Sequence, residues 1–303
     1  MIRVAPEVER ALAAGEPVVA LETTLIAHGF PPGEGAAVGR ESERRVRIAG
    51  AVPATVGILG GEIRVGLEKA ELDGLGPDAR KVGPRDLAAC AVQGAVGATT
   101  AGGTLAVCRA VGIRVLGTGG LGGVHRGFPT PPDVSADLAE LARTQALVVS
   151  SGVKSLLDVA ATAEALETLG VPVLGFRTDE LPLFYAARGG PPVSTRVESA
   201  AEAAAIARSH WELGGGGILL ARAPDDSLDD VEPLIEDALA AAQAEGIAGQ
   251  DVTPFVLGRL HQQSGGRTLR ANAELVAANA ELAAEVARAH AETSYYRSRR
   301  ENA

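Results

Sequence analysis

The chain has 303 residues, a formal net charge of −10 at pH 7 and only 3% aromatic residues. Such an acidic chain lacks the extended basic surface by which proteins bind polymeric nucleic acids. It contains no apolar run near the roughly 20 residues that a membrane helix needs and no secretory signal, so we expect a cytoplasmic protein without a membrane partner.

Apolar residues in the first half of the chain alternate between strand-like and helix-like spacing. The predicted elements are, in order, a strand at 17–23, a helix at 40–50, a β-hairpin at 54–67, helices at 85–94 and 104–112, and a strand at 113–120. Cys90 and Cys108 fall in the two Ala-rich helices without metal-ligand spacing. They are typical of small buried side chains in a reducing compartment.

The second half continues the alternation and ends in helices. Its predicted elements are a helix at 134–144 capped by Ser135 or Asp133, a strand at 146–152, a helix at 154–170, strands at 171–176 and 217–223, and helices at 228–245, 252–264 and 268–293. This alternation predicts a three-layer α/β/α sandwich around a mostly parallel sheet. The length suits one domain over 1–303, with a polar tail at 294–303 that is either disordered or bound to a neighbouring subunit.

Polar and glycine residues are concentrated in loops that follow predicted strands, where sheets of this kind bind ligands. The loop sequence GTGGLG at 117–122 matches the dinucleotide motif GxGxxG, but no helix is predicted before Val134, so the context of that motif is missing. Glycines still allow a ligand to approach the backbone closely. His125 and Arg126 of this loop are candidates for binding phosphate, and a backbone-bonded His125 is an equal alternative.

Three carboxylates stand at the predicted sheet edge. Glu22 ends a strand and is suited to act as a general acid or base, or to anchor the following loop. Asp133 and Asp137 flank a helix start, where a cap and a complement to the helix dipole are the favoured interpretation. The alternative is a sparse oxygen site for a hard divalent cation that keeps most of its water.

Only three of the 28 lysine and arginine residues are lysines, which draws attention to positions where arginine would not serve. Lysine, unlike arginine, becomes a neutral nucleophile when its pKa is lowered. Lys154 begins the predicted helix 154–170, whose dipole is expected to lower its pKa. Lys81 would supply a second cation or hold an anionic ligand, whereas Lys69 belongs to a solvated face.

Taken in order, these loops resemble motifs of the pseudouridine-5′-phosphate glycosidase family, also called the indigoidine-synthase-A-like family. The matching segments are VALETTLIAHGFP, KVGPRDL, GATT, TGGLGGVHRG, DVSADL, SGVKSLLD, STRVES (194–199), TPFVLGRL (253–260) and RANAELVAANAELA (270–283). The resemblance thus covers nearly the whole chain. Departures occur at Thr23, at Gly83–Pro84, in the HGFPP turn and at Ala101, and they bear on substrate fit more than on reaction type.

The resemblance implies reversible cleavage of the C1′–C5 bond of pseudouridine 5′-phosphate to uracil and ribose 5-phosphate through a lysine imine. In the synthetic direction this is a hydro-lyase of the carbon–oxygen lyase class. It assigns Lys154 as nucleophile, Glu22 as proton donor and Asp133 as ligand of one Mn²⁺ per subunit. The implied substrate contacts are Lys81, Ala101, Ser135, Ala136, Asp137, His125 and Asn272. It also implies a homotrimer, with helices 252–293 as a candidate interface.

Three other functions fit parts of the pattern. A class I aldolase-like enzyme would also use a Schiff-base lysine, but on free sugar phosphates. A nucleotide-binding oxidoreductase would explain the glycine motif. A non-catalytic module would bind sugar phosphates without forming a covalent bond to them.

Overall fold

The computed structural model describes residues 1–127, 129–130, 132–247 and 249–301, without side chains at 250 and 293–301. The strands are β1 Ile2–Val4, β2 Val18–Leu21, β3 Val52–Leu59, β4 Glu62–Val65, β5 Arg80–Val82, β6 Gly97–Thr99, β7 Val115–Gly117, β8 Leu147–Ser150, β9 Val173–Phe176, β10 Thr195–Val197 and β11 Ile218–Arg222. The α-helices are α1 Pro6–Ala14, α2 Thr24–His28, α3 Gly35–Ile48, α4 Lys69–Asp73, α5 Leu87–Val92, α6 Ala101–Val111, α7 Ala136–Arg143, α8 Val159–Thr168, α9 Ala200–Glu212, α10 Glu232–Ala244, α11 Val252–Gln263 and α12 Arg267–Glu301. Short 3₁₀ turns are η1 Pro84–Asp86 and η2 Gly249–Asp251.

The described strands join into one sheet in the order β1-β4-β3-β2-β7-β8-β11-β9-β10, with β6 and β5 branching from β3. All neighbouring strands run parallel except β3 with β4 and β3 with β6. The β3–β4 pair is the hairpin predicted at 54–67. The mostly parallel sheet is therefore confirmed, with its centre at β2, β7 and β8.

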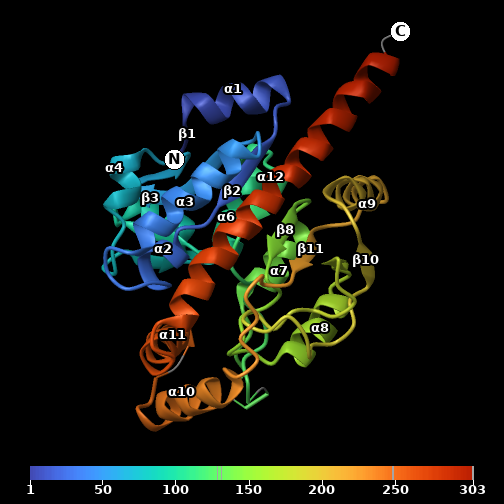
Figure 1. Cartoon of the computed structure of the whole chain (residues 1–303). Coiled ribbons are helices and arrows are strands. Elements are labelled where there is room, and N and C mark those ends of the chain that lie inside the picture. Colours follow the sequence, from blue (N-terminus) through green and yellow to red (C-terminus); the bar gives the residue numbers. More distant parts are fainter. Residues whose placement is uncertain (128, 131, 248, 302–303) are drawn as a thin grey trace.

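Both faces of the sheet are covered by helices, because side chains alternate between two apolar layers. Val19 and Leu21 of β2 pack in a cluster that also contains residues of α3, α9 and α12. Val18 and Ala20 of the same strand belong to the opposite cluster, which includes residues of α6, α7 and α8. Figure 1 shows α12 as the long red helix that crosses the molecule beside the strands.

Small residues bring α12 very close to the sheet. A Cβ placed on Gly117 of β7 would lie 3.1 Å from the Cα of Ala280, so a larger residue there would press the helix away from the strand. Ala280, Ala283 and Ala284 are fully buried on the facing side of the helix. The Ala-rich C-terminal segment is thus an internal layer of the fold, in which small side chains permit dense packing.

The structure corrects the predicted helix 154–170 at its start. The helix in this region, α8, begins at Val159 and is capped by Asp158, whose carboxylate accepts a hydrogen bond from the Ala161 backbone N–H over 2.9 Å. Lys154 therefore lies in the preceding loop, and the expected effect of a helix dipole on it does not apply. Ser135, by contrast, is the N-cap of α7. Of the two predicted caps, Ser135 and Asp133, the structure therefore confirms Ser135.

Several elements were not predicted, including α1, α9 and the short strands β1, β5, β6 and β10. The backbone of α12 continues through most of the predicted polar tail, to Glu301, while the tail's side chains and residues 302–303 lie outside the described part of the chain. Among the described residues, no helix combines the length and hydrophobicity needed to cross a bilayer.

Candidate active site

Three adjacent parallel strands end at the candidate site. Glu22 follows β2, Thr118 follows β7, and the segment that carries Lys154 follows β8. These strands are neighbours in the sheet, so their carboxyl ends meet at one edge, where the loops of α/β proteins bind ligands.

Two connected compartments open at this edge and share Lys81, Lys154 and Thr253. The outer one is a cleft of about 850 Å³ whose lining includes His125, Asp133 and Ser135 through Asp137. The inner one is narrow, about 50 Å³, and its lining includes Glu22, Thr118, Phe184 and Asn272.

Every residue predicted for the site except Ala101 and Arg126 lines one of these compartments. Ala101 is buried at the first residue of α6, directly after Thr100, which lines the outer compartment. The sequence thus identified a spatial cluster, although its members come from separate segments of the chain between Glu22 and Asn272.

Glu22 is a buried carboxyl group with only 4% of its surface exposed. Burial raises its pKa; the positive charge of Lys154 and a hydrogen bond donated by the Thr118 hydroxyl oppose this effect. A carboxyl group with a raised pKa keeps its proton at higher pH than an exposed glutamate. Glu22 is therefore equipped to donate a proton into the inner compartment.

Lys81 is a largely buried lysine whose pKa is lowered. Burial, and after it the nearby positive charge of Lys154, lower the pKa of Lys81 to about 8. Two ammonium groups in one cleft disfavour each other's charge, and an anionic ligand between them would relieve this repulsion. The pair therefore makes the boundary between the compartments a favourable place for an anion.

The glycine loop after β7 packs directly against the Lys154 segment. The backbone N–H of Lys154 donates to the carbonyl of Leu121 over 3.1 Å. A Cβ on Gly120 would lie 3.3 Å from Cγ of Lys154 and 2.6 Å from Cδ2 of Phe184, so only glycine fits at 120. Gly120 thus leaves room for the side chains of Lys154 and Phe184. This role of the loop fits the absence of the helix that a dinucleotide-binding motif would need.

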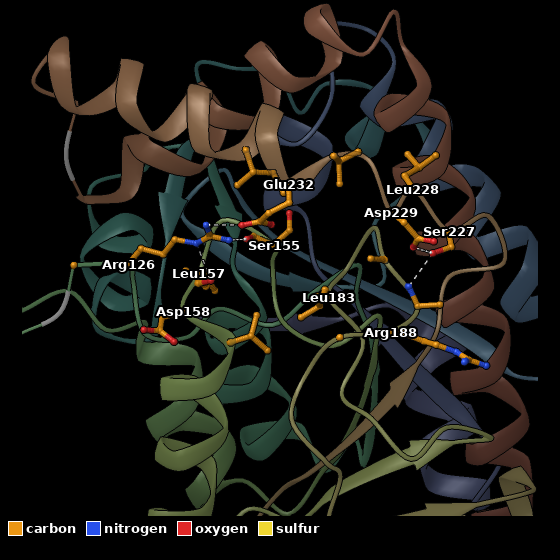
Figure 2. A pocket seen from close by; sticks show the side chains of 17 residues that line it. Arg126, Ser155, Leu157, Asp158, Leu183, Arg188, Ser227, Leu228, Asp229 and Glu232 are labelled. Carbon is orange, nitrogen blue, oxygen red and sulfur yellow. Dashed lines mark hydrogen bonds and ion pairs between the residues drawn. The ribbon is translucent and has the colours of Figure 1, made fainter.

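Arg126 does not join the expected anion site. Its guanidinium donates to the carbonyls of Ser155 and Leu157 over 2.9 and 3.3 Å and pairs with Glu232 at 2.7 Å. Figure 2 shows this side chain directed toward Ser155 and Glu232, in a different pocket from the two compartments. That pocket has a volume of about 930 Å³. Arg126, predicted as a phosphate-binding candidate, therefore lies outside both compartments, and its guanidinium holds the turn that follows Lys154.

His125 remains in the outer compartment beside Asp133. Its Nδ1 lies 3.8 Å from a carboxylate oxygen of Asp133, and its backbone N–H donates to the Asp133 carbonyl over 3.0 Å. Burial lowers the pKa of His125, and the charges of Lys154 and Lys81 act in the same direction, against Asp133. A neutral imidazole is the result, so His125 is a hydrogen-bonding group rather than a second cation.

Asp137 ties two ligand-binding loops together. One carboxylate oxygen accepts from the Gly102 N–H over 2.7 Å, and the other accepts from the Gly122 N–H over 3.0 Å. With 3% exposure, this carboxylate fixes the start of α6 relative to the glycine loop.

Replacing Asp137 by Asn is expected to lower the free energy of unfolding by about 1–3 kcal/mol, because the amide NH₂ would face a buried N–H donor. Urea denaturation measures this loss, with the exposed Asp226→Asn as matched control. An unchanged midpoint in Asp137→Asn would show that the two bonds do not hold the loops.

Sequence reasoning missed Thr118, Phe184 and Thr253. Thr118 sits inside the GTGG motif at the end of β7, a position from which its contact with Glu22 was foreseeable. Phe184 comes from the long connection between β9 and β10, where no periodic pattern indicates a place in the site. Thr253 lies in the first turn of α11, within the predicted helix 252–264, but its direction toward the site was not predicted.

The chain matches the family model described as "Indigoidine synthase A like protein" over residues 7–289. A pseudouridine-5′-phosphate glycosidase of Sorangium cellulosum is 46% identical over 298 residues, which cover 96% of this chain and 94% of the relative. One of Nocardioides sp. is also 46% identical, over 96% and 97% of the two chains.

Two solved structures share the fold. The prealnumycin C-glycosynthase AlnA, solved in complex with ribulose 5-phosphate, has a TM-score of 0.87 and 39% identity and covers 98% of this chain and 99% of its own. An indigoidine synthase A (IdgA)-like protein of Thermotoga maritima has a TM-score of 0.85 and 38% identity over 95% of each chain. From the family match and from identity over almost its whole length, the chain belongs to the indigoidine synthase A like family.

Proposed function

We propose that the protein is a pseudouridine-5′-phosphate glycosidase that reversibly cleaves the C1′–C5 bond to give uracil and ribose 5-phosphate. The observation that carries this proposal is the pairing of a buried proton donor, Glu22, with Lys154 in one narrow compartment next to a polar cleft. The name shared by the relatives that are 46% identical supports the same activity.

A C-glycoside demands different chemistry from an ordinary glycoside, because its leaving group has no oxygen to protonate. In the proposed path the C1′–O4′ bond of the ribose ring breaks, the neutral amine of Lys154 adds to C1′, and the proton that the amine loses passes to O4′. Glu22 then delivers its proton to C5 of uracil. The nitrogen lone pair forms a C1′=N imine as the C1′–C5 bond breaks, and water hydrolyses the imine to ribose 5-phosphate and free lysine.

The two compartments divide the substrate between them in this proposal. The phosphate and sugar occupy the outer cleft, near Lys81, the Thr100 hydroxyl and the His125 imidazole. The base enters the inner compartment, where Asn272 offers an amide for hydrogen bonds. A phosphate beside Lys81 raises the pKa of that ammonium and keeps it charged.

We propose Asp133 as the ligand of a single Mn²⁺. The described residues contain no cluster of three or more His, Cys, Asp or Glu side chains that would enclose a metal. One carboxylate at the rim of a water-accessible cleft nevertheless suits a hard cation that keeps most of its waters. Such an ion would supply positive charge for an anionic substrate.

Asp133→Asn is expected to weaken Mn²⁺ binding by about 10-fold or more, since the charged ligand is lost. The electron paramagnetic resonance signal of free Mn²⁺ measures this without reference to activity. Asp226→Asn, an exposed carboxylate outside the cleft, should bind as the wild type does. Equal affinity in Asp133→Asn and the wild type would place the ion elsewhere.

The function itself is tested by incubating the protein with Mn²⁺ and pseudouridine 5′-phosphate and separating the products by chromatography. Release of uracil and ribose 5-phosphate in equal amounts is expected. Binding of ribose 5-phosphate without any cleavage would instead favour the non-catalytic sugar-phosphate module.

A second candidate is C-glycosylation of another aromatic acceptor, favoured by the similarity to a C-glycosynthase solved with a sugar phosphate. An aldolase-like reaction on the free sugar phosphate is the other Schiff-base alternative. Incubation of ribose 5-phosphate with and without uracil separates them, because only the proposed activity forms pseudouridine 5′-phosphate.

We propose that the chain acts as one domain, that it works as a homotrimer in the cytoplasm, and that the synthetic direction is a hydro-lyase reaction. Parts of helices α11 and α12, which cover the expected interface at 252–293, also pack within their own chain, so only their exposed faces are available to a neighbour.

A further inference from the structure

We infer that Phe184 is the wall of the inner compartment on which the uracil ring lies, and so determines which aglycone the enzyme accepts. This inference rests on the proposed function and adds a residue that neither the sequence motifs nor the strand ends indicate.

The backbone of Phe184 is held in an unfavourable conformation. Its φ is +64°, and among the described residues only Arg177 shares a positive φ without being glycine. A bulky side chain rarely adopts this region, and residues that do so are concentrated at functional sites. We therefore ask which residues the Phe184 side chain contacts in this conformation.

Hydrogen bonds on both sides of Phe184 enforce that conformation. Its N–H donates to the carbonyl of Ser151, at the end of β8, over 3.1 Å, and the Tyr185 N–H donates to the Leu183 carbonyl over 2.7 Å. The carbonyl of Tyr185 in turn accepts from Leu228 over 2.8 Å. The turn is thus fastened to the strand that leads to Lys154.

The ring of Phe184 lies between the reactive lysine and a buried tyrosine. It packs so closely on the backbone at Gly120 that a Cβ there would be 2.6 Å from it, and that same point is 3.3 Å from Cγ of Lys154. On Tyr185 it packs edge to face, with centroids 4.7 Å apart at 82°. Glycine and tyrosine therefore fix the ring close to the aliphatic part of the Lys154 side chain.

The remaining lining of the inner compartment suits a pyrimidinedione. Phe184 is the only phenylalanine, tyrosine or tryptophan among the described residues that line it, and Asn272 and Glu22 supply polar groups. Enzymes that bind a single base read its edge with hydrogen bonds and hold its face against aromatic or apolar side chains. An amide offers both donors and an acceptor to the N–H and C=O groups of uracil.

The test compares the full-length Phe184→Leu and Phe184→Ala proteins with the wild type in synthesis from uracil and ribose 5-phosphate. We expect the KM for uracil to rise by about 10-fold or more in Phe184→Ala and less in Phe184→Leu, because stacking on the base is lost. Borohydride trapping of ribose 5-phosphate on Lys154, which needs no base, should be little changed in both variants.

Phe176→Leu serves as matched control, because Phe176 ends β9 and lies outside both compartments. It should leave the KM for uracil unchanged even if thermal stability falls. An unchanged KM for uracil in Phe184→Ala, or a parallel loss of uracil affinity and trapping, would overturn the inference. A wild type that forms no product from uracil would refute the proposed function instead, and the trapping assay would still report on the lysine.

Discussion

Replacing Lys154 by arginine is expected to lower kcat/KM for cleavage by about 10⁴-fold or more, the scale seen when a covalent nucleophile is removed. Arginine keeps the positive charge next to Lys81 but offers no neutral amine to C1′. The substitution therefore separates nucleophilic attack from electrostatic binding of the phosphate. Steady-state release of uracil from pseudouridine 5′-phosphate measures the effect.

Two other arginine variants complete this comparison. Lys69→Arg, at the start of α4 and outside both compartments, should keep wild-type activity. Lys81→Arg keeps a cation at the anion site and is expected to raise KM for the phosphorylated substrate more than it lowers kcat. An active Lys154→Arg together with an inactive Lys81→Arg would contradict the assignment of the nucleophile.

Glu22→Gln is expected to lower kcat by about 10²- to 10⁴-fold, because the amide preserves shape and burial but has no proton to give to C5. The hydrogen bond from Thr118 remains possible, so the substituted side chain should stay in position. Burial raises the pKa of Glu22, and the wild-type rate should fall as pH rises through that pKa. A pH–rate profile of kcat/KM should lack this alkaline limb in Glu22→Gln.

The same pKa shift has a consequence for stability. A carboxyl group whose pKa is raised on folding stabilises the fold at pH below its unfolded pKa, and this contribution is lost as pH rises through the folded value. Glu22→Gln should therefore gain stability relative to the wild type as pH increases. Urea denaturation at several pH values measures the difference, and a difference that does not change with pH would exclude a buried, titrating Glu22.

Much of the site was predictable because parallel strands bring their ends together. Once β2, β7 and β8 are placed side by side, Glu22, the GTGG loop and Lys154 must meet, whatever lies between them in the chain. The predicted strands at 17–23, 113–120 and 146–152 supply these ends, and their order side by side comes from the structure. The roles of these residues required the family resemblance, because the spacing alone left a structural carboxylate and a solvated lysine as alternatives.

The rest depended on contacts that local patterns do not encode. Residues 154–158 have helical periodicity, but Arg126 and the glycine loop hold their backbone groups instead, so α8 starts only at Val159. The lowered pKa of Lys81 arises from burial and from Lys154, which is far from it in sequence. Phe184 reaches the site through a strained turn within the long connection from β9 to β10.

Trapping the imine and locating it on the chain distinguishes Lys154 from the other lysines as the nucleophile. The protein is incubated with Mn²⁺, ribose 5-phosphate and sodium borohydride, digested, and mapped by mass spectrometry. We expect a reduced pentose-phosphate adduct on the peptide that contains Lys154 and no adduct on this peptide in Lys154→Arg. An adduct on Lys81, the lysine whose pKa is lowered to about 8, would contradict the assignment of Lys154 and identify Lys81 as the nucleophile instead.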